Sequence, residues 1–163
     1  MKRFHVHLHV ADLAASTRFY SGLFGTAPTR AEADYAKWML TDPPVNFAIS
    51  ARGHAPGLDH LGIQADTAEE LAELKARAER ADLALLNEGE TTCCYARSDK
   101  HWVTDPQGVA WEHFHTLGGI PRFSDGEPPA HTSAPAPSEP APAAGCCPGS
   151  ARESASPARK GCC

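Results

Sequence analysis

A short internal repeat limits the folds that this chain can adopt. The segment Trp38-Met39-Leu40-Thr41-Asp42-Pro43 reappears, one residue shorter, as Trp102-Val103-Thr104-Asp105-Pro106. Each copy is expected to end one strand and to open the next. Repetition of such a unit is typical of a duplicated fold, in which two half-domains face each other and enclose a cavity.

The first half of the chain predicts a strand, a helix and further strands. From Phe4 to Val10, apolar and imidazole side chains alternate with period two, which favours a strand that carries its histidines on one face. Asp12 provides an N-cap for a helix that Gly25 ends. Two short strands are expected next, at Tyr35 to Leu40 and at Val45 to Ser50.

The second half repeats this order. Leu58 to Ala65 predicts a strand, and Thr67 with Glu70 forms a capping box for a helix that continues to about Ala81. Four short strands are then expected, near Ala84 to Leu86, Thr92 to Ala96, His101 to Thr104 and Ala110 to Thr116. The fold class is therefore predicted to be α+β, with two βαβββ modules at about residues 1–52 and 58–117.

A change in composition marks the end of the folded part, which we expect to span residues 1–120. Residues 121–163 are mostly Pro, Ala, Ser and Gly with scattered charge. Such a composition cannot bury enough apolar surface to offset its ordering entropy, so a disordered tail is predicted. Two adjacent thiol pairs stand out in it, Cys146-Cys147 and Cys162-Cys163.

Charge and hydropathy exclude several classes of partner. The net charge of −5 at pH 7 leaves no basic stripe that would neutralise a phosphate backbone, so no nucleic acid is expected as a partner. No window approaches the roughly 18 apolar residues that span a bilayer. His5, His7 and His9 also interrupt the apolar core of any signal peptide. A cytoplasmic protein, monomeric or homodimeric and without a membrane partner, is predicted.

Three residues at matching positions of the two modules predict a mononuclear metal site. His5 and His60 fall on each other at the two module starts, and Glu112 in the last strand aligns with Ala48. Two imidazoles and one carboxylate on one side of a divalent ion leave other positions open for dioxygen or a substrate. Fe(II) fits this set, and Zn, Mn, Ni or Co would fit it as well.

The other strand histidines have plainer interpretations. His7 projects from the same face as His5, roughly 6.6 Å further along the strand, so it would line the cavity or support the ligands from behind. His9 is expected to be a partly exposed, hydrogen-bonded side chain. His113 and His115 point to the opposite face of their strand and are expected at the surface.

The adjacent cysteines Cys93 and Cys94 predict a binding site for a soft element. They lie between a turn expected at Gly89 and a strand, where Arg97 and Lys100 would lower the pKa of the thiols. In a reducing compartment such thiols stay free rather than forming disulfides. Two thiolates suit a large soft centre such as trivalent arsenic or cadmium. The alternative is simple strand alternation, with one cysteine buried and one exposed.

Three segments within residues 1–117 carry a family resemblance. They are Val10 to Gly25, then Asp59-His60-Leu61-Gly62, and Thr92-Cys93-Cys94-Tyr95 through Trp111-Glu112. Together they resemble the vicinal oxygen chelate (glyoxalase/bleomycin-resistance/dioxygenase) superfamily and, within it, the ArsI/CadI group of organoarsenical lyases and cadmium-induced proteins. The first segment indicates only the superfamily, whereas the double cysteine is much more specific.

The resemblance implies an enzyme that uses ferrous iron and dioxygen to break the carbon–arsenic bond of trivalent methyl- or arylarsenicals, releasing arsenite. By this resemblance His60 and Glu112 match metal ligands, and Cys93 and Cys94 match the arsenical-binding pair. His5 is a departure, since the group often has glutamine there. A histidine would still bind iron and would also tighten the binding of zinc or nickel.

Two alternatives stay open at this point. One is a non-catalytic resistance protein that sequesters cadmium or arsenite through its thiols. The other is a glyoxalase-like or fosfomycin-modifying metalloenzyme, in which the same triad polarises an oxygen substrate and the cysteines are incidental. In the lyase interpretation the tail pairs would collect arsenical and raise its local concentration through a flexible tether.

Overall fold

Two copies of one strand and helix pattern follow each other along residues 1–121, the part of the chain that this computed structural model describes. The first copy contains β1 (Arg3–His9), α1 (Leu13–Phe24), β2 (Arg30–Ala31), β3 (Tyr35–Thr41) and β4 (Pro44–Ser50). The second contains β5 (Gly57–Ala65), α2 (Ala68–Arg80), β6 (Leu85–Cys93), β7 (Ala96–Thr104) and β8 (Ala110–Gly119). The predicted tail, with Cys146-Cys147 and Cys162-Cys163, lies outside the described residues.

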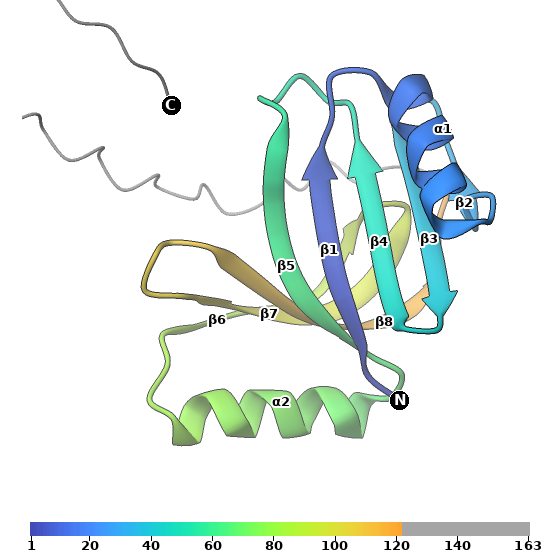
Figure 1. Ribbon diagram of the computed structural model, residues 1–163. Helices are drawn as coiled ribbons and strands as arrows, with labels where there is room; N and C mark the ends of the chain where they lie inside the picture. Colours follow the sequence, from blue (N-terminus) through green and yellow to red (C-terminus); the bar gives the residue numbers. More distant parts are fainter. Residues whose placement is uncertain (122–163) are drawn as a thin grey trace, which may run out of the picture.

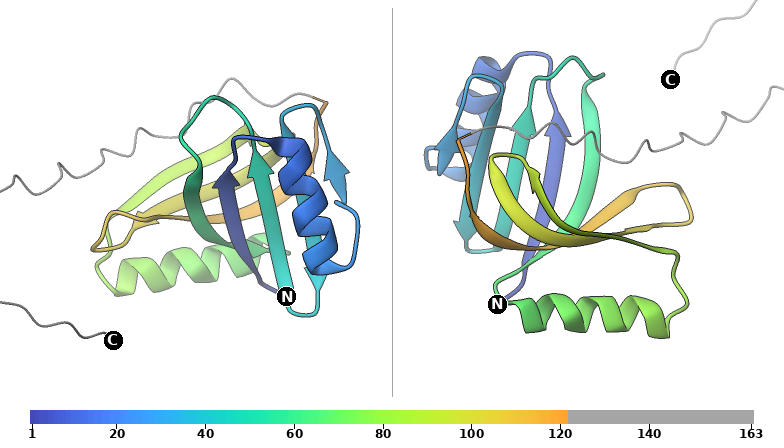
Figure 2. Two further views of the ribbon diagram at one scale, coloured as in Figure 1. Left: turned by 45° about the horizontal axis from the view of Figure 1, so that its top comes forward. Right: turned by 180° about the vertical axis from the view of Figure 1, so that it is seen from behind.

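The strands of both copies form one curled sheet in the order β2-β3-β4-β1-β5-β8-β7-β6 (Figure 1). Within the copies, β1 pairs with β4 and β5 pairs with β8, both in parallel. The copies meet where β1 runs antiparallel to β5. Figure 2 shows the two halves of the sheet at a steep angle, with α1 outside the first half and α2 outside the second. The predicted α+β fold of two βαβββ modules is confirmed.

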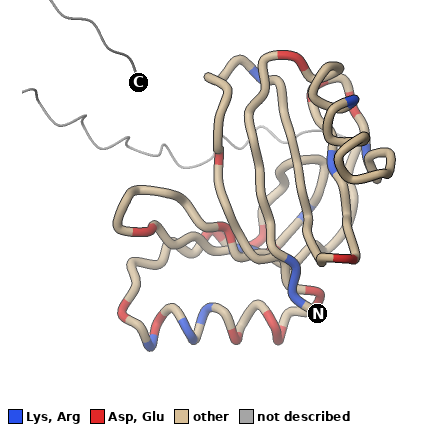
Figure 3. Tube along the Cα trace, in the orientation of Figure 1, with Lys and Arg blue, Asp and Glu red and all other residues tan. Residues whose placement is uncertain are grey.

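Local signals set the ends of both helices, as predicted. The Asp12 side chain accepts a hydrogen bond in the first turn of α1, and Gly25 ends that helix with a φ of 66°. In α2 the Thr67 side chain accepts from the backbone of Glu70. Acidic residues lie in the first turn of α2 and basic residues in the last (Figure 3), which suits the helix dipole. Neither helix in residues 1–121 is long and apolar enough to cross a membrane.

Apolar cores lie on the outer faces of the sheet, whereas the inner face is polar. Under α1, Trp38, Phe47 and Ile49 pack with aromatic residues of the helix. Under α2, Leu71 and Leu74 pack on Ala65. The inner face instead buries polar side chains, a rare arrangement that usually marks a functional site. These side chains include His5, His7, Asn46, His60, Gln64, Lys100 and Glu112.

The strand registers support the equivalence of His5 with His60. In the β1–β4 pair, Ala48 lies beside the residue two positions after His5. In the β5–β8 pair, Glu112 lies beside the residue two positions after His60. The alignment of Ala48 with Glu112 and that of the two histidines therefore describe one and the same superposition of the modules.

The repeated tryptophans, in contrast, are not structurally equivalent. Trp38 lies opposite Phe47, the residue before Ala48, whereas Trp102 lies opposite Glu112. This one-residue offset places the two side chains on opposite faces of the sheet. Trp38 is fully buried in the core under α1, and Trp102 lines the inner cavity. The sequence match thus identified the duplication correctly but misaligned its most visible residues.

The expectation of four short strands after the second helix was also wrong. The segment expected near Ala84 to Leu86 and the start of that expected near Thr92 to Ala96 lie in one continuous β6, which ends at Cys93, and β7 runs from Ala96 to Thr104. Gly89, expected as a turn, lies at a register shift inside β6 with a φ of 72°. A β-bulge there absorbs the left-handed glycine without ending the strand.

Candidate metal and thiol site

The three residues predicted as metal ligands converge on the inner face of three neighbouring strands. His5 Nε2 lies 3.1 Å from His60 Nε2, and the Glu112 carboxylate lies 3.7 Å from the first nitrogen and 3.4 Å from the second. All three side chains are buried. Donors about 2.1 Å from a shared ion would be roughly 3.0–3.4 Å apart, so these distances suit a single metal.

The far nitrogens of both imidazoles have acceptors, which fixes the tautomers. His5 Nδ1 donates to the backbone oxygen of Asn46 at 3.0 Å, and His60 Nδ1 donates to Asp59 at 2.9 Å. In the neutral form of each imidazole, Nε2 therefore presents a lone pair toward the Glu112 carboxylate. Two lone pairs and a carboxylate that face one another repel unless a cation lies between them. The donor set thus fits a resident metal ion.

The pKa values of His5 and His60 also indicate that the triad favours one positive charge. Burial and the neighbouring His60 lower the pKa of His5 to about 4. Burial also disfavours the charged form of His60, but hydrogen bonds to Asp59 and Glu112 outweigh it and raise its pKa to about 9. One cation is therefore stabilised at this point.

Lys100 holds the carboxylate of Glu112 in place from the side opposite the imidazoles. Its Nζ donates to Glu112 Oε1 at 2.7 Å, which leaves Oε2 facing His60. Burial disfavours the charged forms of both Lys100 and Glu112. The Lys100 ammonium nevertheless lowers the pKa of Glu112, and the carboxylate raises the pKa of Lys100. Sequence reasoning missed this contact, although both residues lie on the same face of adjacent strands by period-two alternation.

Gly62 allows the close approach of β5 and β8 that brings His60 to Glu112. A Cβ atom at Gly62 would lie 2.2 Å from the backbone oxygen of Glu112, a distance that no side chain tolerates. The glycine in the segment Asp59-His60-Leu61-Gly62 is therefore required by strand packing.

The thiols of Cys93 and Cys94 lie side by side because β6 ends at Cys93 and Cys94 is the first residue of a turn. Adjacent side chains of a strand point to opposite faces. Here Cys94 and Tyr95 have φ values of 55° and 61° and form the two-residue turn between β6 and β7. The two Sγ atoms consequently lie 3.1 Å apart. The alternative of plain strand alternation is therefore wrong.

Contacts from the first module hold this turn in its left-handed conformation. The Tyr95 hydroxyl donates to Asp34 at 2.6 Å. Arg30 donates to the backbone oxygen of Tyr95 at 3.1 Å, and its guanidinium lies 4.8 Å from the centre of the Tyr95 ring. Left-handed backbone costs about 1–2 kcal/mol for a residue with a side chain. We call Asp34, Arg30 and Tyr95 the turn clamp.

The two thiols differ in acidity. The hydrogen bond from Cys94 lowers the pKa of Cys93, and Lys100 acts in the same direction against burial. The hydrogen bond to Cys93, together with burial, raises the pKa of Cys94. Cys93 thus loses its proton more readily than Cys94. Of the two cations that the sequence suggested for this effect, Lys100 contributes, and Arg97 is exposed.

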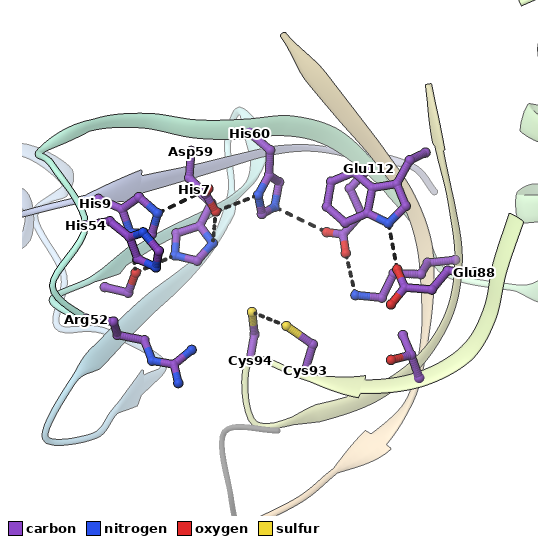
Figure 4. A pocket seen from close by; sticks show the side chains of 14 residues that line it. His7, His9, Arg52, His54, Asp59, His60, Glu88, Cys93, Cys94 and Glu112 are labelled. Atoms are coloured by element: carbon purple, nitrogen blue, oxygen red, sulfur yellow. Dashed lines mark hydrogen bonds and ion pairs between the residues drawn. The ribbon is translucent and has the colours of Figure 1, made fainter. Parts of the chain in front are cut away.

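The thiols share one cavity with His60 and Glu112 of the triad, about 560 Å³ including the part open to solvent. Its lining includes Cys93, Cys94, His60, Glu112, Lys100 and Trp102. Figure 4 shows the two sulfurs pointing across this space toward His60 and Glu112. A neighbouring cavity of about 410 Å³ reaches His5 and shares both cysteines, Lys100 and Glu112. A bound molecule can therefore touch both kinds of donor at once.

The remaining histidines occupy two different environments. His7 is buried and lines the cavity, and His9 is partly buried beside it. His113 does point away from the triad, but the prediction of a surface position was wrong. It is buried because α2 covers that face, and it contacts His101 at 3.0 Å. His115 is partly buried, with its Nδ1 3.2 Å from a backbone oxygen.

Comparisons with known proteins agree with the fold. The family model described as Glyoxalase/Bleomycin resistance protein/Dioxygenase superfamily matches residues 2–113. A "Trivalent organoarsenical cleaving enzyme" of Bacillus sp. (strain MD1) is 44% identical over 119 residues, which cover 71% of this chain and 74% of that protein. The "Cadmium-induced protein CadI" of Mycobacterium bovis is 35% identical over 127 residues, covering 77% and 84%.

Solved structures with a similar fold include a glyoxalase and a dioxygenase. The Mn(II)-bound glyoxalase from Novosphingobium aromaticivorans superposes with a TM-score of 0.52 and 18% identity, covering 77% of this chain and 44% of that chain. An extradiol ring-cleaving dioxygenase from B. fuscum gives 0.53 and 19%, covering 71% and 32%. At this level of identity the likeness concerns the fold alone.

Proposed function

Because this chain belongs to the Glyoxalase/Bleomycin resistance protein/Dioxygenase superfamily, and matches proteins named trivalent organoarsenical cleaving enzymes, we propose that it cleaves the carbon–arsenic bond of trivalent methyl- or arylarsenicals and releases arsenite. One observation carries the proposal: a vicinal thiol pair lines both the cavity that contains His60 and Glu112 and the neighbouring cavity that contains His5 and Glu112. Thiolates select a soft arsenic atom, whereas imidazoles and a carboxylate select a harder redox metal.

His5, His60 and Glu112 are the residues that would hold Fe(II). Their lone pairs converge as described above, and Lys100 and Asp59 fix two of them from behind. The chemistry that Fe(II) would supply there is the activation of dioxygen at open coordination positions. The same donor set also accepts Zn, Mn, Ni or Co, so the metal is itself part of the proposal.

Cys93 and Cys94 would bind and orient the arsenical. The Cys93 thiolate attacks a trivalent arsenic that carries two hydroxyl groups, and one hydroxyl leaves as water after taking up a proton. Cys94 then loses its proton to the second departing hydroxyl, so that two As–S bonds replace two As–O bonds. The Lys100 ammonium favours the Cys93 thiolate. The carbon–arsenic bond is thereby held inside the cavity in a fixed orientation.

The decisive experiment loads the full chain anaerobically with Fe(II) and adds methylarsenite and dioxygen. Arsenite release and oxygen uptake are measured together. We expect turnover in the native chain, and none in Cys93→Ser or Cys94→Ser, with the metal content unchanged. The matched control replaces another adjacent pair, Cys146 and Cys147, by serine and should keep turnover at saturating substrate. Absence of arsenite release from the loaded native protein would refute the proposal.

A second candidate is sequestration of cadmium or arsenite without turnover. The likeness to the cadmium-induced protein and the vicinal thiol pair favour it. Sequestration predicts stoichiometric binding that Glu112→Gln leaves unchanged, whereas the lyase loses turnover in that variant. A different glyoxalase-like activity would be indicated if both cysteine variants behaved like the native chain.

A further inference from the structure

A second group of metal-donor side chains lies beside the triad. His7 and His9 of β1 face Asp59 of β5 in the same cavity, and His54 lies against His9 with ring centres 4.5 Å apart (Figure 4). The triad does not need His7, His9 or His54 as ligands. Donor atoms of His7, Asp59 and His60 all lie within 4.8 Å of one another. This group shares His60 with the triad and adds nitrogen and oxygen donors that the triad does not use.

Asp59 and Ser50 connect the two imidazoles at both ends. His7 Nδ1 lies 3.4 Å from Asp59 Oδ2, and His9 Nε2 lies 3.1 Å from Asp59 Oδ1. At their other ends, His7 Nε2 and His9 Nδ1 lie 3.0 Å and 3.1 Å from the Ser50 hydroxyl. The four side chains thus form a closed ring of four contacts.

This ring contains one hydrogen too few. Each neutral imidazole carries one ring hydrogen and the Ser50 hydroxyl carries one, while an ionised carboxylate carries none. Four contacts need four hydrogens, so one contact brings two lone pairs together. The longest contact is that between His7 Nδ1 and Asp59 Oδ2. A buried nitrogen that faces a carboxylate oxygen in this way is the arrangement already described for the triad.

We propose that His7, His9 and Asp59 form a second binding site for a divalent cation of the zinc, nickel and copper class. His7 Nδ1 and Asp59 Oδ2 supply the first two donors. His9 Nε2 lies beside Asp59 Oδ1, the other oxygen of the same carboxylate. Imidazole-rich sites prefer these ions to magnesium or calcium. The cation enters from the cavity, since all three donors line it.

The second site is linked to the triad through Asp59. The oxygen that faces His7 also accepts the hydrogen bond from His60 Nδ1. A cation on Asp59 withdraws electron density from that hydrogen bond and so weakens His60 as a donor to the first metal. Filling the second site is therefore expected to lower the metal affinity of the triad, an effect that goes beyond the proposed lyase reaction.

The test uses Zn²⁺ as the probe on the metal-free, reduced full chain. Bound zinc is counted after dialysis, and its position is read from anomalous scattering at the zinc edge in crystals. Four proteins are compared: the native chain, His7→Phe, Glu112→Gln and the control His115→Gln on the opposite face. Thiol-bound zinc is common to all four and cancels in the differences.

We expect His7→Phe to bind one zinc fewer than the native chain, while His115→Gln binds the same number. Glu112→Gln should lose the triad zinc yet keep an anomalous peak between His7 and Asp59. If His7→Phe fails to fold, Asp59→Asn provides the same loss of one zinc while keeping an acceptor for His60. The proposal is overturned if His7→Phe binds as much zinc as the native chain and the native crystals show no anomalous peak beside Asp59. In that case a proton supplies the fourth hydrogen of the ring formed by His7, His9, Asp59 and Ser50.

Discussion

The two modules share one backbone plan but differ in what they contribute to the cavity. β1 and β5 each supply one imidazole from equivalent positions, His5 and His60. Ala48 in β4 stands where β8 has Glu112. The outermost strands differ most, because β2 has two residues and β6 has nine and leads into the thiol turn. Duplication therefore supplies the symmetric half of the site, and the second module alone supplies the carboxylate and the thiols.

Apart from the histidines of β1, the first module contributes support for the reactive groups of the second. By strand register, Tyr35 stands where the second module has Lys100. Arg30 and Asp34 reach across to the thiol turn. The comparison teaches that one copy of a duplicated unit can keep the shape while the other acquires the reactive groups. Each prediction below makes one module resemble the other or removes a contact between them.

The largest effect is expected from Glu112→Ala, which gives the second module the alanine of the first. The triad should lose metal affinity by more than about 100-fold, measured by calorimetry. The apo protein should also lose about 3–5 kcal/mol of unfolding free energy, because Lys100 stays buried without its partner. Adding Lys100→Met should restore stability but not metal binding. Unchanged stability in the single variant would contradict the ion-pair interpretation.

Gly62→Ala should destabilise the sheet at the contact between β5 and β8. The position equivalent to Gly62 in the first module is His7, whose Cβ is accommodated, whereas a Cβ at Gly62 would meet the Glu112 backbone. We expect a loss of about 1–3 kcal/mol in denaturant unfolding. The matched control is Gly22→Ala in α1, where the new Cβ meets nothing within 4 Å and should stabilise the helix by about 1 kcal/mol.

Tyr95→Phe removes one bond of the turn clamp between the modules. Without the hydroxyl bond to Asp34, the left-handed turn is less populated and the thiols are less often side by side. Loss of about 1 kcal/mol corresponds to roughly fivefold weaker binding of phenylarsine oxide, measured by competition with a dithiol. Zinc binding to the triad should not change. Asp34→Asn, which keeps an acceptor, should have a smaller effect; equal effects would argue against the clamp.

The smallest effect concerns His101, which stands where the first module has Ala36. Burial and the neighbouring His113 lower the pKa of His101 to about 4. The unfolded chain therefore binds more protons between the usual value of about 6.5 and pH 4, and stability falls as the pH falls through this window. His101→Leu should reduce that loss by about 1 kcal/mol in unfolding curves. An unchanged pH slope would exclude His101 as the cause.

Local signals in the sequence predicted much of the fold and the grouping of His5, His60 and Glu112. Caps at Asp12 and Thr67 and the alternation in β1 act over a few residues, so they are visible without the structure. His5 and His60 were identified because the duplication repeats them. Such features depend little on the rest of the chain.

Features that depend on register or on distant contacts were missed. The offset of Trp102 relative to Trp38 follows from pairing with β8, which no local pattern records. Turn rules favour glycine in a two-residue turn, whereas Cys94 and Tyr95 adopt it because Asp34, distant in sequence, holds the tyrosine. His113 is buried because α2 crosses its strand. Tertiary packing decided each of these cases.

The thiol turn also bears on how the protein withstands oxidation. The Cα atoms of adjacent residues are about 3.8 Å apart across a trans peptide, whereas disulfides usually span about 4.4–6.8 Å. A disulfide between Cys93 and Cys94 would therefore be strained and readily reduced, although their sulfurs lie only 3.1 Å apart. A single large atom can bridge the two sulfurs without that strain. The pair is thus suited to stay reduced in a cavity where we propose that dioxygen is consumed.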